Sequence, residues 1–154
     1  MAAYLKNEWI AANQKRVDEL GAKKIAYVHM KDMGDEELQQ FLKEMTGEWY
    51  RRDALILDLR FNTGGNVHDE VLNFLSRRPY LQWKYRGGRF APQPPFATAE
   101  KPIVLLVNEQ SLSDAEMTAA GFKALRLGKI VGTETYRWLI FTSDRDLVDG
   151  SFYR

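Results

Sequence analysis

The sequence predicts an α/β layered fold with a largely parallel central sheet. Two runs, ALILDL (54–59) and PIVLLV (102–107), are almost continuously apolar, as expected of strands that are covered on both faces. Segments with helical spacing alternate with these strands, and such alternation favours a parallel sheet with helices packed on it. A length of 154 residues suits one domain with a single core.

The first part of the chain contains a predicted strand between two predicted helices. Apolar residues recur near helical spacing from Tyr4 to Leu20, and Gly21 is expected to end this helix. The segment KIAYVHM (24–30) reads as a strand. A second helix is expected over 34–45, with Asp35 as its cap. Four apolar side chains would form its buried face: Leu38, Phe41, Leu42 and Met45.

The remaining elements are expected as follows: a helix from about Val67 to Arg77, a strand in LQWKYRGG (81–88), a surface loop in PQPPF (92–96), a helix that ends near Leu127, and a strand in KIVG (129–132). The segment DLVDGSFYR (146–154) predicts a hairpin, because Asp-Gly lies between short apolar runs.

Composition excludes several classes of function. With 22 basic and 21 acidic side chains the formal net charge is +1, so neither a nucleic-acid nor a membrane partner is expected. The pairs Arg51-Arg52 and Arg77-Arg78 are interpreted as solvated ends of amphipathic segments. The absence of cysteine excludes disulfides and thiolate metal sites. No signal core and no run of about 18 apolar residues occurs, so we expect a soluble chain.

Two polar turns follow the two apolar strands. These are NTGGN (62–66) and NEQSLSD (108–114). Ligands of parallel sheets bind beyond the carboxyl ends of the strands. We therefore expect both turns to lie at one edge of the sheet and to carry the chemistry.

Ser113 has two possible roles. As a helix cap, its hydroxyl would accept from the amide of Glu116, whose carboxylate would reach back to the Ser113 amide. As a nucleophile, it would expose its hydroxyl at the helix start, where the amide of Asp114 could stabilise an oxyanion. A nucleophilic hydroxyl also needs a general base, and no neighbour in the sequence supplies one. The residues alone leave both roles open.

The NTGG turn (62–65) is also open to two interpretations. It is either a simple turn before a helix that Asn66 caps, with Asp69 in the box position, or a close-approach site for a ligand. It is not a phosphate loop, because no Lys-Ser or Lys-Thr follows. Both histidines, His29 in a predicted strand and His68 in the first turn of a helix, are expected to be structural. They show no zinc-ligand spacing, and no metal or cofactor is expected.

Three segments occur in a specific order: DLRFNTGG (58–65), VNEQSLSDAE (107–116) and GKIVGTETY (128–136). Together they resemble the catalytic domain of the tail-specific serine peptidases, and within that group the tricorn-type members. Segments 7–34 are similar to the helix and strand that follow the PDZ domain of that type, and LVDGSFYR (147–154) to the hairpin beyond its active site.

The resemblance implies a fold, a function and a site. The fold is a crotonase/ClpP-like spiral of β-β-α units, with residues 1–154 as the nucleophile-bearing core domain, without a PDZ or histidine-bearing domain and shortened at its C-terminus. The function is serine-type hydrolysis of peptides. The site consists of Ser113 as nucleophile, with the amides of Asp114 and Gly65, or less favourably Gly64, as the oxyanion hole. The chain is also expected to be cytoplasmic and a homo-oligomer.

The departures from the family pattern concern the general base. TYRWLIF (135–141) has no lysine where a serine-lysine dyad has one, and Arg137 replaces a glycine that favours positive φ. Neither His29 nor His68 matches the family's catalytic histidine. The base is thus expected to be missing from this chain, which would be weak or inactive alone. The alternative is a non-catalytic protein-binding or oligomerisation module, with exposed aromatics near Trp83 and Trp138 as contacts. A third interpretation is an engineered or truncated domain.

Overall fold

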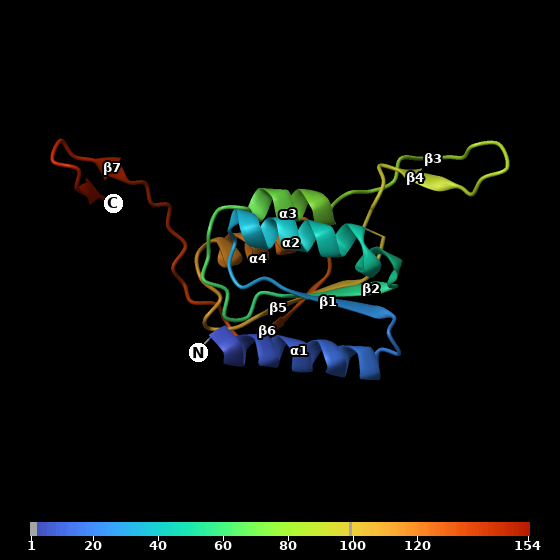
Figure 1. Cartoon of the computed structure of the whole chain (residues 1–154), viewed down its shortest axis with the longest axis horizontal. Coiled ribbons are helices and arrows are strands. Elements are labelled where there is room, and N and C mark those ends of the chain that lie inside the picture. Colours follow the sequence, from blue (N-terminus) through green and yellow to red (C-terminus); the bar gives the residue numbers. More distant parts are fainter. Residues whose placement is uncertain (1–2, 99) are drawn as a thin grey trace.

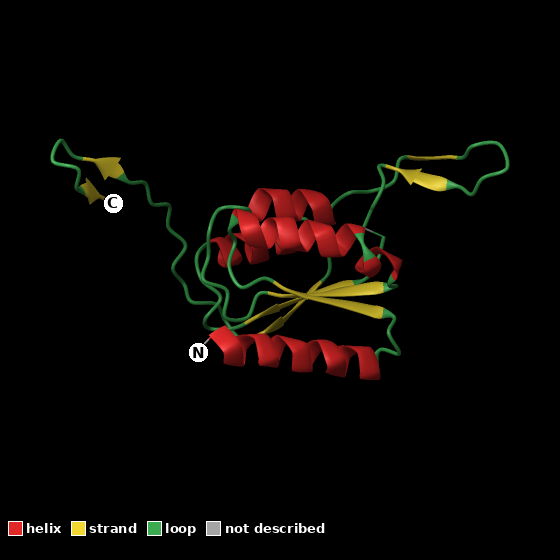
Figure 2. Ribbon diagram, in the orientation of Figure 1, coloured by secondary structure: helices red, strands yellow, loops and turns green. Residues whose placement is uncertain are grey.

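A four-stranded parallel sheet forms the centre of the molecule (Figures 1 and 2). The computed structural model describes residues 3–98 and 100–154. In spatial order the strands are β1 (Ile25–His29), β2 (Ala54–Asp58), β5 (Ile103–Val107) and β6 (Lys129–Gly132). The predicted parallel α/β layering is confirmed.

Helices cover both faces of this sheet (Figure 1). One face carries α1 (Ala3–Leu20), and the other carries α2 (Asp35–Thr46), α3 (His68–Leu75) and α4 (Asp114–Ala124). A short 3₁₀ helix, η1 (Glu48–Arg51), follows α2. None of the helices in the described part of the chain is long and apolar enough to cross a membrane.

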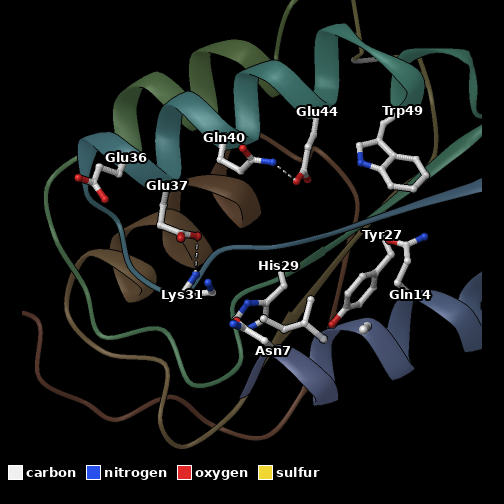
Figure 3. A pocket seen from close by; sticks show the side chains of 12 residues that line it. Asn7, Gln14, Tyr27, His29, Lys31, Glu36, Glu37, Gln40, Glu44 and Trp49 are labelled. Carbon is white, nitrogen blue, oxygen red and sulfur yellow. Dashed lines mark hydrogen bonds between the residues drawn. The ribbon is translucent and has the colours of Figure 1, made fainter. Parts of the chain in front are cut away.

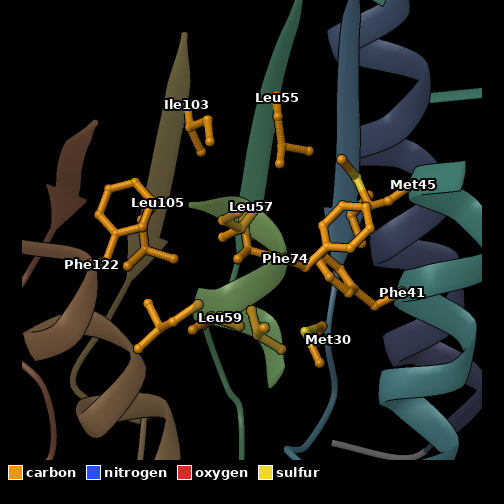
Figure 4. Packing of buried hydrophobic residues seen from close by; sticks show 14 of the residues in the cluster. Met30, Phe41, Met45, Leu55, Leu57, Leu59, Phe74, Ile103, Leu105 and Phe122 are labelled. Carbon is orange, nitrogen blue, oxygen red and sulfur yellow. The ribbon is translucent and has the colours of Figure 1, made fainter. Parts of the chain in front are cut away.

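The core lies between the sheet and the three helices α2, α3 and α4 (Figure 4). Leu57 and Leu105 of the central strands are completely buried there, and the rings of Phe41 and Phe74 meet edge to face at 5.5 Å. The apolar face predicted for α2 is confirmed for Leu38, Phe41 and Met45, whereas Leu42 is only partly buried.

The helix predicted from Tyr4 to Leu20 is confirmed as α1, but the apolar residues at its two ends are exposed. Tyr4 is 70% exposed and Leu20 is 78% exposed. The half-buried stripe of α1 instead combines apolar and polar side chains: Trp9, Ile10, Asn13, Gln14 and Val17. Tyr4 and Leu20 lie off this stripe, whereas Trp9, Ile10 and Val17 lie on it.

Two small antiparallel hairpins project from the sheet and its helices (Figure 2). The first pairs β3 (Leu81–Trp83) with β4 (Ala91–Gln93), so the predicted strand is only three residues long and the loop predicted from 92 begins inside β4. The second pairs β7 (Arg145–Asp146) with β8 (Phe152–Tyr153) and confirms the predicted C-terminal hairpin.

Two predictions for charged residues are wrong. Arg52 is not a solvated end but is 9% exposed, and its guanidinium donates to Asp18 at 3.0 Å and to Glu48 at 3.1 Å. Asp35 does not cap α2, because Gly34 occupies the cap position and no side chain caps the helix there.

Candidate active site

The two polar turns meet at the carboxyl edge of the sheet, as predicted. The amide of Leu112 donates to the carbonyl oxygen of Asn62 at 3.0 Å, and the amide of Phe61 donates to Asn108 Oδ1 at 3.0 Å. The hydroxyl of Ser111, which is completely buried, donates to the carbonyl oxygen of Leu59 at 2.8 Å. The segment after β2 and the segment after β5 are thus held together by backbone and side-chain hydrogen bonds.

Asn62 shapes the glycine turn from inside the protein. Its side chain is completely buried, donates to the Met30 carbonyl oxygen at 3.0 Å and accepts from the Gly64 amide at 2.9 Å. Gly65 packs directly on the backbone of Met33, where a Cβ atom would lie 2.1 Å from the Met33 carbonyl oxygen. Only glycine fits at position 65 without displacing that backbone.

Ser113 adopts a strained backbone conformation at the start of α4. Its φ is 54° and its ψ is −110°, a region that residues with a Cβ atom rarely occupy. The glycine turn lies directly against it, since a Cβ atom on Gly64 would be 2.9 Å from the Ser113 Cβ. Ser113 is half-buried there, and backbone strain of this kind clusters at functional sites.

The capping arrangement of Ser113 and Glu116 is present as predicted. The Ser113 amide donates to Glu116 Oε2 at 2.8 Å. The Glu116 amide, however, donates at 2.8 Å to the Ser113 carbonyl oxygen, so it does not require the Ser113 hydroxyl as its acceptor. The capping role of the serine is therefore compatible with a second role for its hydroxyl.

The two glycines of the turn differ in the state of their amides. Gly64 uses its amide in the bond to Asn62, whereas the amide of Gly65 makes no hydrogen bond to any described residue. The amide of Asp114, in the first position of α4, also has no partner within residues 3–98 and 100–154. Among the three amides predicted as oxyanion donors, those of Asp114 and Gly65 are therefore free to bind a ligand oxygen, whereas that of Gly64 is already hydrogen-bonded within the described part of the chain.

A cleft opens beside Ser113. Gly65 and Ser113 line both of two adjoining hollows of about 310 and 340 Å³. The opposite wall of both hollows includes Ile140 and Thr142, from the extended segment after β6. The cleft is open to solvent and brings the serine and the glycine turn to one surface.

The loop after β6 is tied to α4 by Glu116. Its Oε1 accepts from the Thr135 hydroxyl at 2.8 Å and from the Arg137 amide at 2.7 Å, and its Oε2 accepts from the Trp138 amide at 3.0 Å. Arg137 has a φ of 66°, so this position does adopt the left-handed conformation that favours glycine.

The cap predicted for α3 is wrong. The residue before α3 is Val67, and Asn66 does not cap the helix. Instead, Asp114 Oδ2 accepts from the amides of Val67 at 2.8 Å and of His68 at 3.1 Å. Asp114 Oδ1 also lies 2.5 Å from His68 Nδ1, in contact but outside hydrogen-bond geometry. Sequence reasoning missed this side chain, because its partners lie 46 and 47 residues away along the chain.

Both histidines are engaged away from Ser113. His29 packs edge to face against Trp9 at 5.4 Å, its Nε2 lies 2.9 Å from the Arg60 carbonyl oxygen, and burial lowers its pKa. His68 contacts Asp114, as described. No hydrogen bond between a histidine and Ser113 occurs among the described residues, and these residues contain no cluster that could hold a metal ion.

A separate hollow of about 580 Å³ lies beside β1, between α1 and α2 (Figure 3). Glu37 and Glu44 of α2 face it from one side, and Gln14 of α1 faces it from the other. Neither the glycine turn nor Ser113 lines this hollow.

Comparison with known proteins assigns the fold and these segments to one family. The model of peptidase family S41 matches residues 24–154. The tricorn protease of Thermoplasma volcanium is 35% identical over 144 residues, which are 93% of this chain and 14% of that protein. The tricorn protease of Thermoplasma acidophilum is 33% identical over 144 residues, 93% of this chain and 13% of that protein. The chain thus spans about one seventh of the length of these curated relatives.

Solved structures agree with this assignment. The crystal structure of the tricorn protease has a TM-score of 0.80 and 31% identity, and the match covers 92% of this chain and 14% of that one. The photosystem II D1 C-terminal processing protease has a TM-score of 0.63 and 26% identity, over 83% of this chain and 35% of that one. The chain therefore belongs to peptidase family S41.

Proposed function

We propose that this chain carries the nucleophile and the oxyanion hole of a tricorn-type serine peptidase, with Ser113 as the nucleophile and the amides of Asp114 and Gly65 as the oxyanion donors. One observation carries the proposal. A strained serine at the start of α4 lies against the glycine turn, beside two amides that have no other partner among the described residues.

In this mechanism Ser113 Oγ adds to the carbonyl carbon of a peptide bond, and its proton passes to a general base. The carbonyl oxygen becomes an oxyanion that the two amides stabilise, which is typically a large contribution to catalysis of acyl transfer. The C–N bond then breaks, the amine leaves with a proton, and an ester with Ser113 remains. Water hydrolyses this ester and regenerates the hydroxyl.

The general base is proposed to come from outside the described residues. Both histidines have other partners, and Arg137 is unsuitable because a guanidinium stays protonated. The chain alone is accordingly weak or inactive. We assign residues 1–154 to the core domain of such a peptidase, with a crotonase/ClpP-like spiral, and expect the complete protein to act on peptides in the cytoplasm as a homo-oligomer.

Active-site labelling tests the proposal. The folded chain is treated with a fluorophosphonate probe, and mass spectrometry locates the adduct. We expect slow labelling at Ser113 that is absent from Ser113→Ala. Ser151→Ala is the matched control, since Ser151 is exposed and its hydroxyl donates to Asp149 at 2.6 Å. The Ser151→Ala variant should be labelled at Ser113 at the same rate as the wild type. A folded protein without any adduct at Ser113 would contradict the proposed role.

A non-catalytic binding or oligomerisation module is the second candidate. It is favoured by exposed aromatic side chains at the β3–β4 hairpin and on the segment after β6: Tyr80, Trp83, Tyr85 and Phe90 in the first, Trp138 and Phe141 in the second. Analytical ultracentrifugation distinguishes the oligomeric version of this candidate, because a monodisperse monomer at high concentration would exclude it.

A further inference from the structure

The carboxylate of Asp114 is buried between two helix starts. Only 4% of the residue is exposed, yet its carboxylate has no arginine or lysine partner among the described residues. Its negative charge is instead balanced by the amides of Val67 and His68 at the positive end of α3, and by the imidazole edge of His68. A buried carboxylate without such donors would be costly, so these contacts fix its position.

These contacts join the two segments that carry the available amides. Asp114 presents its own amide from the first position of α4. Its side chain holds Val67, two residues after Gly65, and thereby holds the end of the glycine turn. On the other side, the turn is held by Met33, whose carbonyl oxygen accepts from the Asn66 amide at 2.8 Å. The backbone bond from Leu112 to Asn62 joins the same two segments before the serine, and the Asp114 side chain joins them after it, so the distance between the two amides depends on both.

We infer that the Asp114 side chain is a positioning residue for the oxyanion hole: it sets the Gly65 amide relative to the Asp114 amide. This inference rests on the proposed function. A side chain that only caps a helix would contribute stability alone. Loss of the Asp114 carboxylate should in addition move a donor amide and slow acylation of Ser113.

Two variants separate these possibilities. Asp114→Asn retains an oxygen that can accept from Val67 and His68, whereas Asp114→Ala removes it. Asp69→Ala is the matched control. Asp69 is an exposed carboxylate in the first turn of α3, beside His68, and its Oδ1 lies 3.7 Å from His68 Nε2. Far-UV circular dichroism verifies that each variant is folded.

Two quantities are measured for each variant. One is the chemical shift of the Gly65 amide in ¹H–¹⁵N spectra, and the other is the rate of fluorophosphonate labelling at Ser113. In Asp114→Ala we expect a shifted Gly65 resonance and labelling about 100-fold slower, as for loss of one oxyanion donor. In Asp114→Asn, which keeps an acceptor for both amides, the shift and the slowing should both be smaller than in Asp114→Ala. In Asp69→Ala, both quantities should stay close to the wild type. An unshifted Gly65 resonance in folded Asp114→Ala overturns the inference, as does an unchanged labelling rate.

Two further readouts keep the inference separate from the proposed function. If wild-type Ser113 is not labelled at all, the proposed function fails, and the Gly65 resonance still decides the positioning role. If Asp114→Ala does not fold, hydrogen exchange of the wild type decides. First-turn amides of a helix ordinarily have no intrahelical acceptor, so the Val67 and His68 amides should be protected only if the Asp114 carboxylate holds them. Rapid exchange at both amides would overturn the inference.

Discussion

The Glu116 carboxylate accepts a hydrogen bond from the Ser113 amide at 2.8 Å and at the same time holds the loop that follows β6. Four donors converge on this carboxylate: the amides of Ser113, Arg137 and Trp138 and the hydroxyl of Thr135. Glu116 is only 8% exposed. The residue read from the sequence as half of a capping box therefore also organises one wall of the cleft.

Glu116→Ala should destabilise the fold and release this loop. Removal of a buried acceptor leaves several amides without partners, and we expect a loss of about 1 to 3 kcal/mol in the free energy of unfolding. Urea unfolding measures this loss, and hydrogen exchange should show faster exchange at Arg137 and Trp138. Glu134→Ala is the control, because Glu134 makes only an exposed pair with Arg137. Equal effects of the two variants would contradict the role of Glu116.

The stability supplied by Glu116 should depend on pH. Burial alone would raise the pKa of this carboxyl, but the hydrogen bonds from Thr135, Ser113, Arg137 and Trp138 outweigh burial and lower the pKa below its ordinary value of 4.5. The folded state then binds the proton less tightly than the unfolded state does. The stability that ionised Glu116 contributes to the fold is therefore present above pH 4.5, and it is lost as the pH falls through the lower pKa of the folded state.

Thermal unfolding of the wild type and of Glu116→Gln between pH 7 and pH 3 tests this dependence. We expect the wild type to have the higher midpoint at pH 7, and the difference to shrink toward pH 3. A difference that stays constant over this range would show that the charge of Glu116 contributes nothing.

The strands and most helices were predictable because their signals are local. ALILDL and PIVLLV are almost continuously apolar, since β2 and β5 are the central strands of the sheet and none of their residues is exposed. The length of the exposed β3 was not predictable, because its three residues are set by pairing with β4 about ten residues further along the chain, and no burial pattern marks them. In α1 the apolar members of the contact stripe follow helical spacing, but its polar members, Asn13 and Gln14, carry no hydrophobic signal in the sequence.

The site was predictable in its backbone parts and not in its supporting side chains. Ser113 and the glycine turn stand in recognisable segments at the ends of strands. The resemblance favoured Gly65 over Gly64 without a physical reason, and the buried side chain of Asn62 supplies one, because it accepts from the Gly64 amide. The role of the Asp114 carboxylate required contacts across 47 residues, which no local pattern contains.

Arg52→Ala should be strongly destabilising, unlike its neighbour. Arg52 joins α1 to η1 through Asp18 and Glu48, and its guanidinium also stacks over Trp49 at 4.8 Å. Its removal leaves the half-buried Asp18 carboxylate and the Lys23 carbonyl oxygen without this donor, and we expect a loss of about 1 to 3 kcal/mol in unfolding free energy. Arg51→Ala is the matched control at an exposed position, where a change within about 0.5 kcal/mol is expected. Urea unfolding of both variants decides.

Arg137→Gly should stabilise the loop after β6. Arg137 has a φ of 66°, where a residue with a Cβ atom is strained and glycine is not. We expect the thermal midpoint to rise by about 2 to 4 °C. Arg137→Ala is the control, because it also removes the exposed pair with Glu134 but keeps the Cβ atom. A midpoint that rises equally in both variants would assign the effect to the lost charge instead of the backbone.

Gly64→Ala should impair Ser113 beyond its effect on stability. Gly64 has a φ of 81°, and a Cβ atom there would lie 2.9 Å from the Ser113 Cβ and 3.0 Å from the Leu112 carbonyl oxygen. Because neither neighbour is a flexible side-chain end, the serine must shift. A displacement of about 1 Å can cost about 100-fold in rate, so fluorophosphonate labelling at Ser113 should fall by at least about tenfold.

Gly87→Ala isolates the cost of backbone strain in this experiment. Gly87 has a similar φ of 77°, but a Cβ atom there would contact nothing within 4 Å. Both variants should lose about 1 kcal/mol in unfolding free energy from the left-handed conformation, and only Gly64→Ala should slow labelling. If Gly64→Ala is labelled as fast as Gly87→Ala, the packing of the glycine turn against Ser113 does not control the reactivity of the serine.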